Sequence, residues 1–236
     1  MNTAVEIDKS VTDQMVLNLD VGELTSALEL VNKVGDYFDY VKVGSELYAE
    51  SGADAVNTLR DMGKKVFLDL KLHDIPNTVE RAARAHAKRG IAMATVHASG
   101  GLEMLKAARR GFDEGAAEAG YEPPVLLAIT VLTSLPPDQE AFDERLDLIK
   151  EAGCDLVCSA LEVAYVHEKL PDAKMLVPGI RLAGQDLGDQ TRVATPYEAI
   201  RDGARWVALG RAVYAADDPI ASAQEVCAQV KKAQSE

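Results

Sequence analysis

Four ionisable side chains fall in two short stretches of the sequence. Asp69, Lys71 and Asp74 lie in FLDLKLHD, and Lys42 lies in YVKVG. Alternate residues of a β-strand point to the same face, so Phe67, Asp69 and Lys71 are expected to share one face. Two ammonium groups and two carboxylates in one pocket can stabilise a developing negative charge and deliver a proton. The alternative interpretation is a network of ion pairs that only stabilises the rim of the fold.

A second group of residues has the chemistry of a phosphate site. Arg181 ends the sequence PGIR, Gln190 follows nine positions later, and Gly210 and Arg211 close the sequence GARWVALGR. Gly210 permits a close approach of the backbone, and Arg211 offers several donors to a phosphate dianion. The alternative is a helix start with a surface arginine. Together with PGIR, the sequence favours phosphate binding.

Most apolar runs of the chain end in a polar residue. The further examples are Asp20, His97, Thr130, Thr133 and Ser159. We interpret His97 as a hydrogen-bonded histidine at the rim and assign no base role to His73. Cys154 and Cys158 are read as small core residues rather than metal ligands.

The elements that must position these groups alternate regularly. Eight apolar, β-rich runs are Met15–Leu19, Tyr40–Val43, Lys65–Leu70, Ala92–His97, Val125–Val131, Asp155–Cys158, Lys174–Val177 and Trp206–Leu209. Helical patterns follow them at about Glu23–Val34, Ala53–Met62, Thr78–Arg89, Leu102–Ala119, Asp138–Ala152, Leu161–Lys169, Pro196–Asp202 and Pro219–Lys232. Parallel strands need such crossovers. Eight units predict an α/β fold, a single (β/α)8 TIM barrel, with the active site at the C-terminal rim of the strands.

Length and charge narrow the function classes. The 236 residues suit one barrel domain spanning 1–236, with about 1–13 and 232–236 expected to fray. The net charge of −13 argues against binding to nucleic acid or to an anionic membrane surface. No apolar run reaches the roughly 18 residues of a membrane span, and no signal peptide is expected. Three cysteines and no paired CxxC motif predict reduced thiols and a cytoplasmic protein.

The stretch DLKLHDIPNTV at Asp69–Val79 closely resembles the signature of the orotidine 5′-phosphate decarboxylase family. The resemblance covers nearly the whole chain in order. It includes LNLD (Leu17–Asp20), KVG (Lys42–Gly44), VHASGG (Val96–Gly101), VLTS (Val131–Ser134), PGIR (Pro178–Arg181), Gln190-Thr191-Arg192 and Thr195–Arg211. It implies decarboxylation of orotidine 5′-phosphate to UMP and CO2, the last step of de novo UMP biosynthesis, without a metal or an organic cofactor.

The resemblance also implies residue roles. Lys71 donates the proton to C6 and belongs to a charged tetrad with Lys42, Asp69 and Asp74. Substrate contacts are implied for Asp20 at a ribose hydroxyl, Thr133 at the pyrimidine, and Arg181, Gln190, Gly210 and Arg211 at the phosphate. In an implied homodimer, Asp74, Ile75 and Thr78 reach the active site of the partner subunit. Two positions depart from the common pattern: Ala212-Val213-Tyr214 follows Arg211, and Thr95 replaces a commoner Asn.

Two other functions remain open at this point. A sugar-phosphate decarboxylase or hexulose-phosphate synthase uses a similar barrel and an Asp-x-Lys motif, but acts through an enediolate and Mg²⁺. Loss of activity with a chelator would favour that branch. A barrel that only binds phosphate ligands would bind UMP without consuming orotidine 5′-phosphate.

Overall fold

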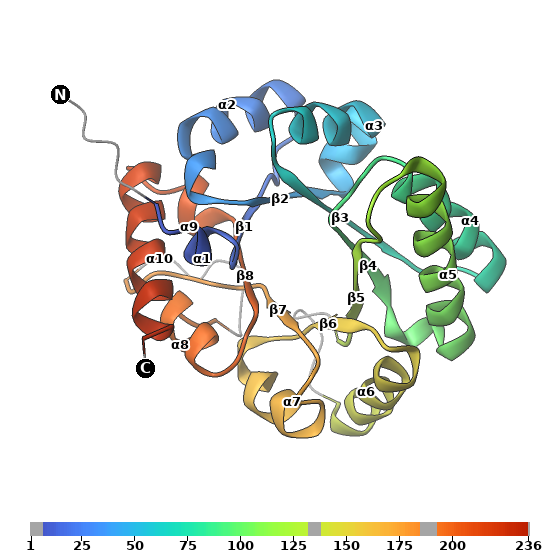
Figure 1. Ribbon diagram of the computed structural model, residues 1–236. Helices are drawn as coiled ribbons and strands as arrows, with labels where there is room; N and C mark the ends of the chain where they lie inside the picture. The colour runs from blue at the N-terminus through green and yellow to red at the C-terminus, as the bar shows by residue number, and fades with distance from the viewer. Residues whose placement is uncertain (1–6, 132–137, 185–192, 236) are drawn as a thin grey trace.

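Eight parallel strands close into a barrel in the computed structural model, which describes residues 7–131, 138–184 and 193–235. Each strand pairs with its sequence neighbours, and β1 pairs with β8 to close the ring (Figure 1). The strands are β1 (Met15–Asn18), β2 (Tyr40–Gly44), β3 (Lys65–Leu72), β4 (Met93–His97), β5 (Val125–Ile129), β6 (Asp155–Val157), β7 (Met175–Val177) and β8 (Trp206–Leu209). The predicted α/β barrel is confirmed, and all eight predicted strands are present with small shifts at their ends.

Helices surround the ring of strands (Figure 1). The α-helices are α1 (Lys9–Thr12), α2 (Leu24–Val34), α3 (Ser45–Asp61), α4 (Pro76–Ala87), α5 (Leu102–Ala119), α6 (Gln139–Ala152), α7 (Val163–Lys169), α8 (Pro196–Arg201), α9 (Arg211–Tyr214) and α10 (Pro219–Ala233). Short 3₁₀ turns are η1 (Gly35–Tyr37), η2 (Ala98–Gly100) and η3 (Ala160–Glu162). Every helix predicted from the periodicity has a counterpart, and α1 and α9 are additional. In the described part of the chain, no helix has the length and apolarity needed to cross a membrane.

Helix α3 begins earlier than the sequence predicts. The expected helix covers only Ala53–Met62, whereas α3 starts at Ser45, directly after β2. Gly52 lies inside α3 with φ of 55° and ψ of −136°, so the helix is kinked there. Glycine adopts a positive φ without the steric cost that a Cβ brings. Gly52, directly before the predicted start of the helix, therefore marks a kink within one helix.

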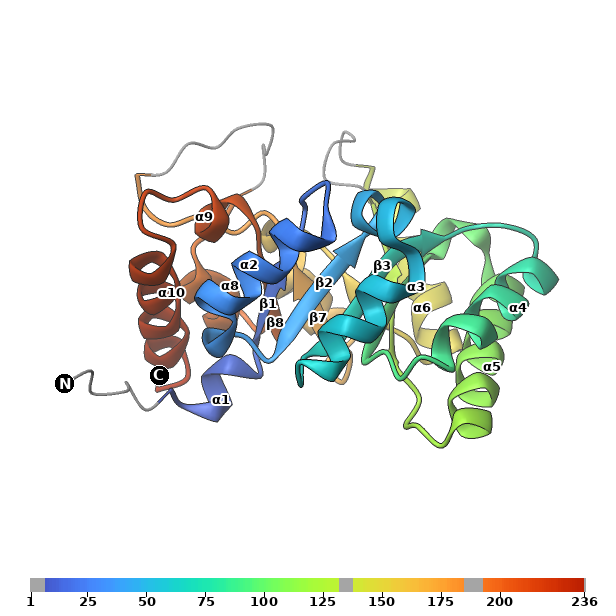
Figure 2. The same ribbon diagram turned by 90° about the horizontal axis from the view of Figure 1, so that it is seen from above.

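The described chain begins at residue 7, and it forms a short helix, α1, within the amino-terminal stretch that the sequence predicts to fray. The Asp8 side chain caps α1 by accepting a hydrogen bond from the amide of Ser10. Val11 is buried at the end of the barrel where the strands begin, and Asp13 forms ion pairs with Lys65 and Arg205. Helix α1 and α9 lie toward opposite ends of the barrel (Figure 2).

Side chains from the strands divide between two cores. Val66 and Leu68 of β3 face the helices, while Phe67 points into the barrel. The barrel interior is filled by Val16, Tyr40, Phe67, Met93, Leu127, Leu176, Trp206 and Ala208. This division follows the alternation of side chains along a strand. The interior of the barrel is therefore packed with side chains, and in this fold a ligand binds at the rim rather than inside.

Helices α4 and α5 pack closely because α5 carries two glycines at the contact. A Cβ on Gly111 would lie 2.2 Å from the carbonyl oxygen of Glu80, and one on Gly115 would lie 2.2 Å from the carbonyl oxygen of Arg84. Real Cβ atoms do not approach carbonyl oxygens so closely. The spacing of these helices therefore depends on glycine at both positions.

Candidate active site

A pocket of about 270 Å³ opens at the carboxyl ends of the strands. Its polar wall comes from β1, β2 and β3, and its apolar wall from strands on the other side of the barrel. The lining residues are Asn18, Asp20, Lys42, Phe67, Asp69, Lys71, Ile129, Val131, Val157, Leu176, Pro178 and Ala208. Charged groups on one side and apolar groups on the other suit a flat organic ring with an ionic substituent.

Lys42, Asp69 and Lys71 form a continuous charged cluster in this pocket. The Nζ of Lys71 donates to Oδ2 of Asp69 at 2.8 Å, and the Nζ of Lys42 lies 3.5 Å from the same oxygen. Lys42 also donates to Oδ1 of Asp20 at 2.7 Å. The side chains of Lys42 and Asp69 are each only 10% exposed, whereas Asp20 is 46% exposed. The structure thus brings together two ammonium groups and two carboxylates.

Mutual attraction keeps the buried pair ionised. Burial alone would lower the pKa of Lys42, but the Asp69 and Asp20 carboxylates raise it above 10.5. Burial would likewise raise the pKa of Asp69, but Lys42 and Lys71, together with hydrogen bonds from Lys71 and Thr95, lower it below 3.8. Both groups are therefore charged at neutral pH. The pocket holds ammonium groups in a partly desolvated place, where they act more strongly on a nearby charge.

The backbone at Lys71 departs from a regular strand. Leu68 pairs with Ala94 and Leu72 pairs with Val96, so the three residues between them on β3 face only Thr95 on β4. Lys71 is the one non-glycine residue in the described chain with a positive φ, 51°. Its side chain still meets Asp69, as predicted from alternation. The bulge, however, rather than a regular strand, directs it there.

Asp74 lies apart from this cluster in the single chain. It lies in the exposed loop between β3 and α4, where its Oδ1 accepts a hydrogen bond from the amide of Ile75 at 2.6 Å. Ile75 is 66% exposed, and Thr78 is exposed on the first turn of α4. These three residues are exposed to solvent in the single chain and do not line the pocket.

The expected phosphate residues lie after β7 and β8. Arg181 is buried, with its amide donating to the carbonyl of Ala194 at 3.0 Å and its Nη1 donating to the carbonyl of Ile180 at 2.8 Å. Gly210 follows β8, and the exposed Arg211 begins α9. Because β8 pairs with β1, Gly210 and Arg211 lie beside the polar wall of the pocket. Thr133 and Gln190 fall outside the described residues.

Sequence reasoning did not assign Asn18 and Tyr214 to the site. Asn18 lines the pocket, and its buried Oδ1 has no hydrogen-bond partner among the described groups. A polar residue two positions after the inward-facing Val16 was the signal that could have identified it. Tyr214 lies beside Gly210, since a Cβ on that glycine would be 3.6 Å from its ring. Burial and the Asp20 charge raise the pKa of Tyr214, so its hydroxyl stays protonated.

Two histidine rings lie close together at the edge of the site, with their planes tilted by 35°. The rings of His73 and His97 have centroids 5.3 Å apart. Burial, followed by the charges of His73 and Lys71, holds the pKa of His97 below 6.5. His97 is therefore a neutral, half-buried rim residue at physiological pH.

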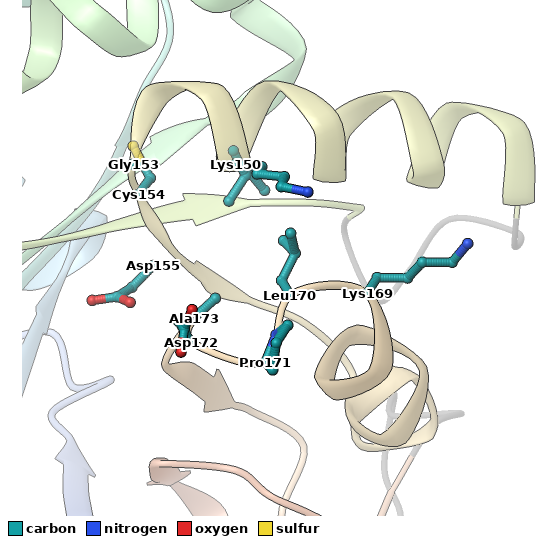
Figure 3. Close-up of a pocket in the computed structure, with 10 residues that line it drawn as sticks. Lys150, Gly153, Cys154, Asp155, Lys169, Leu170, Pro171, Asp172 and Ala173 are labelled. Atoms are coloured by element: carbon teal, nitrogen blue, oxygen red, sulfur yellow. The ribbon is translucent and has the colours of Figure 1, made fainter.

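A larger groove of about 460 Å³ lies at the opposite end of the barrel, between the carboxyl ends of α6 and α7. Its charged residues do not converge on a common point: Lys150 and Lys169 extend to one side, and the Asp155 carboxylate points to the other (Figure 3). Asp155 already accepts a hydrogen bond from the amide of Lys174. Cys154 at its edge is buried, as expected for a core residue. The rim pocket is therefore the candidate active site.

The chain is similar to a known family of proteins over most of its length. Residues 13–226 match the family described as "Orotidine 5'-phosphate decarboxylase / HUMPS family". The orotidine 5′-phosphate decarboxylase of Moorella thermoacetica is 41% identical over 235 residues, covering 93% of this chain and 92% of that protein. The enzyme of that name from Streptococcus thermophilus is 43% identical over 204 residues, covering 80% and 85%. A crystal structure of orotidine 5′-phosphate decarboxylase from Lactobacillus acidophilus has a TM-score of 0.81 and 35% identity, covering 92% of this chain and 99% of that chain.

Proposed function

The chain belongs to the orotidine 5′-phosphate decarboxylase / HUMPS family, and on that premise we propose that it converts orotidine 5′-phosphate to UMP and CO2 with Lys71 as the proton donor. This carboxy-lyase reaction completes de novo UMP biosynthesis. The observation that carries the proposal is the cluster of Lys42, Asp69 and Lys71 in the rim pocket, in which Lys42 and Asp69 are buried.

The proposed reaction needs Lys71 as its only acid. The bond between C6 of the pyrimidine and its carboxylate carbon breaks, CO2 leaves, and the electron pair remains on C6. The Lys71 ammonium stabilises this charge and transfers a proton to C6, which gives UMP. The resulting amine regains a proton from solvent, to which the Lys71 side chain is 37% exposed. No metal or organic cofactor takes part in the proposed step.

Asp69 has two electrostatic effects in this proposal. Its carboxylate faces the place of the substrate carboxylate, and two such charges about 4 Å apart repel by about 4 kcal/mol at an effective dielectric of about 20. Asp69 also binds Lys71 and interacts with Lys42, so much of its charge is compensated. We therefore assign Asp69 mainly to positioning the two ammonium groups.

The remaining residues bind the parts of the nucleotide that do not react. Asp20 accepts a hydrogen bond from a ribose hydroxyl, and Thr133 contacts the pyrimidine. The phosphate is bound by Arg181, Gln190, Gly210 and Arg211. Binding energy from the remote phosphate can orient the ring and exclude water, and thereby raise the rate of decarboxylation.

The proposed enzyme is a cytoplasmic homodimer in which Asp74 and Thr78 reach the active site of the partner subunit. The exposure of Asp74 and the 66% exposure of Ile75 support this arrangement, because a second copy could cover the apolar side chain. Asp74 would then complete the charged tetrad of the other subunit rather than that of its own.

A sugar-phosphate reaction that depends on Mg²⁺ is the second candidate. The description of the matched family names a second group, HUMPS, beside the decarboxylases. A Mg²⁺ ion in the rim pocket would need carboxylate ligands, and the carboxylates that line the pocket are those of Asp20 and Asp69. Asp20 and Asp69 each bind a lysine ammonium instead. These contacts favour the pyrimidine nucleotide as substrate.

Loss of orotidine 5′-phosphate absorbance, measured with and without a chelator, tests the proposal. We expect the wild type to consume the substrate equally in both conditions. Lys71→Ala should lose turnover and keep part of its affinity for UMP, while the control Lys150→Ala, altered in the groove at the other end of the barrel, should behave as wild type. Inactive wild-type protein that binds UMP would refute the enzymatic function, and chelator-sensitive activity would favour the sugar-phosphate branch.

A further inference from the structure

Thr95 is a buried hydroxyl residue on β4, only 1% exposed, that faces the bulge in β3. Its Oγ1 accepts a hydrogen bond from the amide of Lys71 at 2.9 Å. The same hydroxyl donates to Oδ1 of Asp69, also at 2.9 Å. One side chain thus contacts both members of the proposed proton-donating pair. The family resemblance assigns no such role to Thr95 and shows only that Thr95 replaces a commoner Asn.

The backbone of Lys71 depends on an external acceptor. The bulge takes this residue out of the regular pairing between β3 and β4, and its φ of 51° is unfavourable for a long side chain. A buried amide needs a hydrogen-bond acceptor, and the Thr95 hydroxyl replaces the missing strand partner. The positive φ of Lys71 is therefore fixed by a side chain of the neighbouring strand.

The orientation of Asp69 depends on the same hydroxyl. Its Oδ2 is bound by Lys71 at 2.8 Å and lies 3.5 Å from Lys42, so both cations act on one oxygen. Thr95 donates a hydrogen bond to the other oxygen, Oδ1. Contacts at both oxygens fix the plane of the carboxylate, and with it the position of the Lys71 ammonium.

We propose that Thr95 is a positioning residue for decarboxylation, which holds the Lys71 backbone and the Asp69 carboxylate in the geometry that delivers the proton to C6. This proposal rests on the proposed function. Thr95 acts through Lys71 and Asp69, and needs no contact with the substrate. Loss of its hydroxyl should therefore affect turnover more than substrate binding.

Thr95→Val tests the proposal, because valine keeps the shape and removes the hydroxyl. We expect kcat to fall about 10- to 100-fold, the effect of a displacement of up to about 1 Å at a reacting group. KM should stay within about threefold, and Thr95→Ser should restore most of the rate. Thr12→Val is the matched control. Thr12 is buried at the opposite end of the barrel and donates at 2.7 Å to Asp39, which also pairs with a lysine.

A pH profile separates positioning from a general structural effect. The Thr95 hydrogen bond contributes to the lowered pKa of Asp69, so Thr95→Val should move the acid limb of kcat to higher pH. The other ionisable groups acting on Asp69, namely Lys42, Lys71 and His97, are unchanged in this variant. A structural defect alone would lower kcat at every pH without moving the limb.

The results of these experiments distinguish a failure of the positioning role of Thr95 from a failure of the proposed decarboxylase function. If wild-type protein does not consume orotidine 5′-phosphate, the proposed function fails. If the wild type is active and folded Thr95→Val retains its kcat and its pH profile, the positioning role is refuted. Circular dichroism establishes that each variant is folded. If Thr95→Val fails to fold, Thr95→Ser and Thr95→Asn take its place, because both keep a polar group. An equal loss of kcat in these two variants would also refute the role.

Discussion

Replacing Lys42 by methionine tests whether the buried cluster carries its charges as the geometry indicates. Methionine keeps an unbranched side chain of similar length and removes the ammonium. Asp69, which is 10% exposed, then loses the cation 3.5 Å from its Oδ2, but keeps its hydrogen bonds to Lys71 and Thr95. Asp20, which is 46% exposed, can be hydrated instead.

The magnitude follows from burial and distance. At 3.5 Å and an effective dielectric of about 20, the Lys42–Asp69 attraction is about 5 kcal/mol. Removing one partner of a buried ion pair costs about 3–5 kcal/mol, and the contacts that Asp69 retains favour the lower end, about 3 kcal/mol. The exposed Asp20 contact adds at most about 1 kcal/mol. For a domain of this size, about 3 kcal/mol lowers Tm by about 6–12 °C.

Thermal unfolding of Lys42→Met beside Lys65→Met gives the comparison. Lys65 also has two carboxylate partners, Asp13 at 2.6 Å and Asp39 at 3.3 Å, but its side chain is 44% exposed. Its loss should cost no more than about 1 kcal/mol, because exposed pairs are screened by water. Equal Tm values for the two variants would refute the inference that burial makes the rim pair strong.

The stability that Lys42 contributes should change with pH in a definite direction. The pKa of Lys42 is raised above 10.5, so its contribution to stability is complete below that pH and is lost as pH rises through the folded-state value. The gap in Tm between wild type and Lys42→Met should therefore be constant near neutrality and close at high pH. A gap that widens with rising pH would contradict the raised pKa.

Three further predictions concern other parts of the chain. The pKa of Asp69 lies below 3.8, so its contribution to stability is present above that pH and is lost as pH falls through the folded-state value. The difference in the free energy of unfolding between wild type and Asp69→Asn, measured in urea, should therefore shrink from neutrality to about pH 3. Arg211→Ala should lower kcat/KM at least about 100-fold if this arginine binds the phosphate, and kinetics near those of wild type would refute that role. Gly111→Ala should destabilise the fold by about 1–3 kcal/mol, because its Cβ would meet the Glu80 carbonyl; Gly115→Ala should behave alike, and an unchanged Tm in both would contradict the close packing of α4 on α5.

The barrel could be predicted because its signals are local. Apolar runs such as Val66–Leu68 alternate between the two cores, and each run is followed by a helical pattern. The kink at Gly52 could not be distinguished from a helix boundary, since glycine occurs at both. Helix α1 was missed because its burial depends on contacts with distant residues, such as the ion pairs of Asp13 with Lys65 and Arg205.

The candidate site was predictable to the extent that it follows from strand ends. Lys42, Asp69 and Lys71 meet because adjacent parallel strands bring their carboxyl ends together. The two-residue alternation does not predict the bulge that gives Lys71 its positive φ, because a bulge depends on the register with β4. Nor does it reveal that Asp74 lies outside the pocket of its own chain, since a loop residue has no strand period to fix its direction.

A crystal structure with bound UMP is the most direct test of proton donation by Lys71. We expect the Nζ of Lys71 to lie about 3–3.5 Å from C6 of the pyrimidine, still hydrogen-bonded to Asp69. UMP bound in the rim pocket with the Lys71 ammonium directed away from C6 would contradict that role.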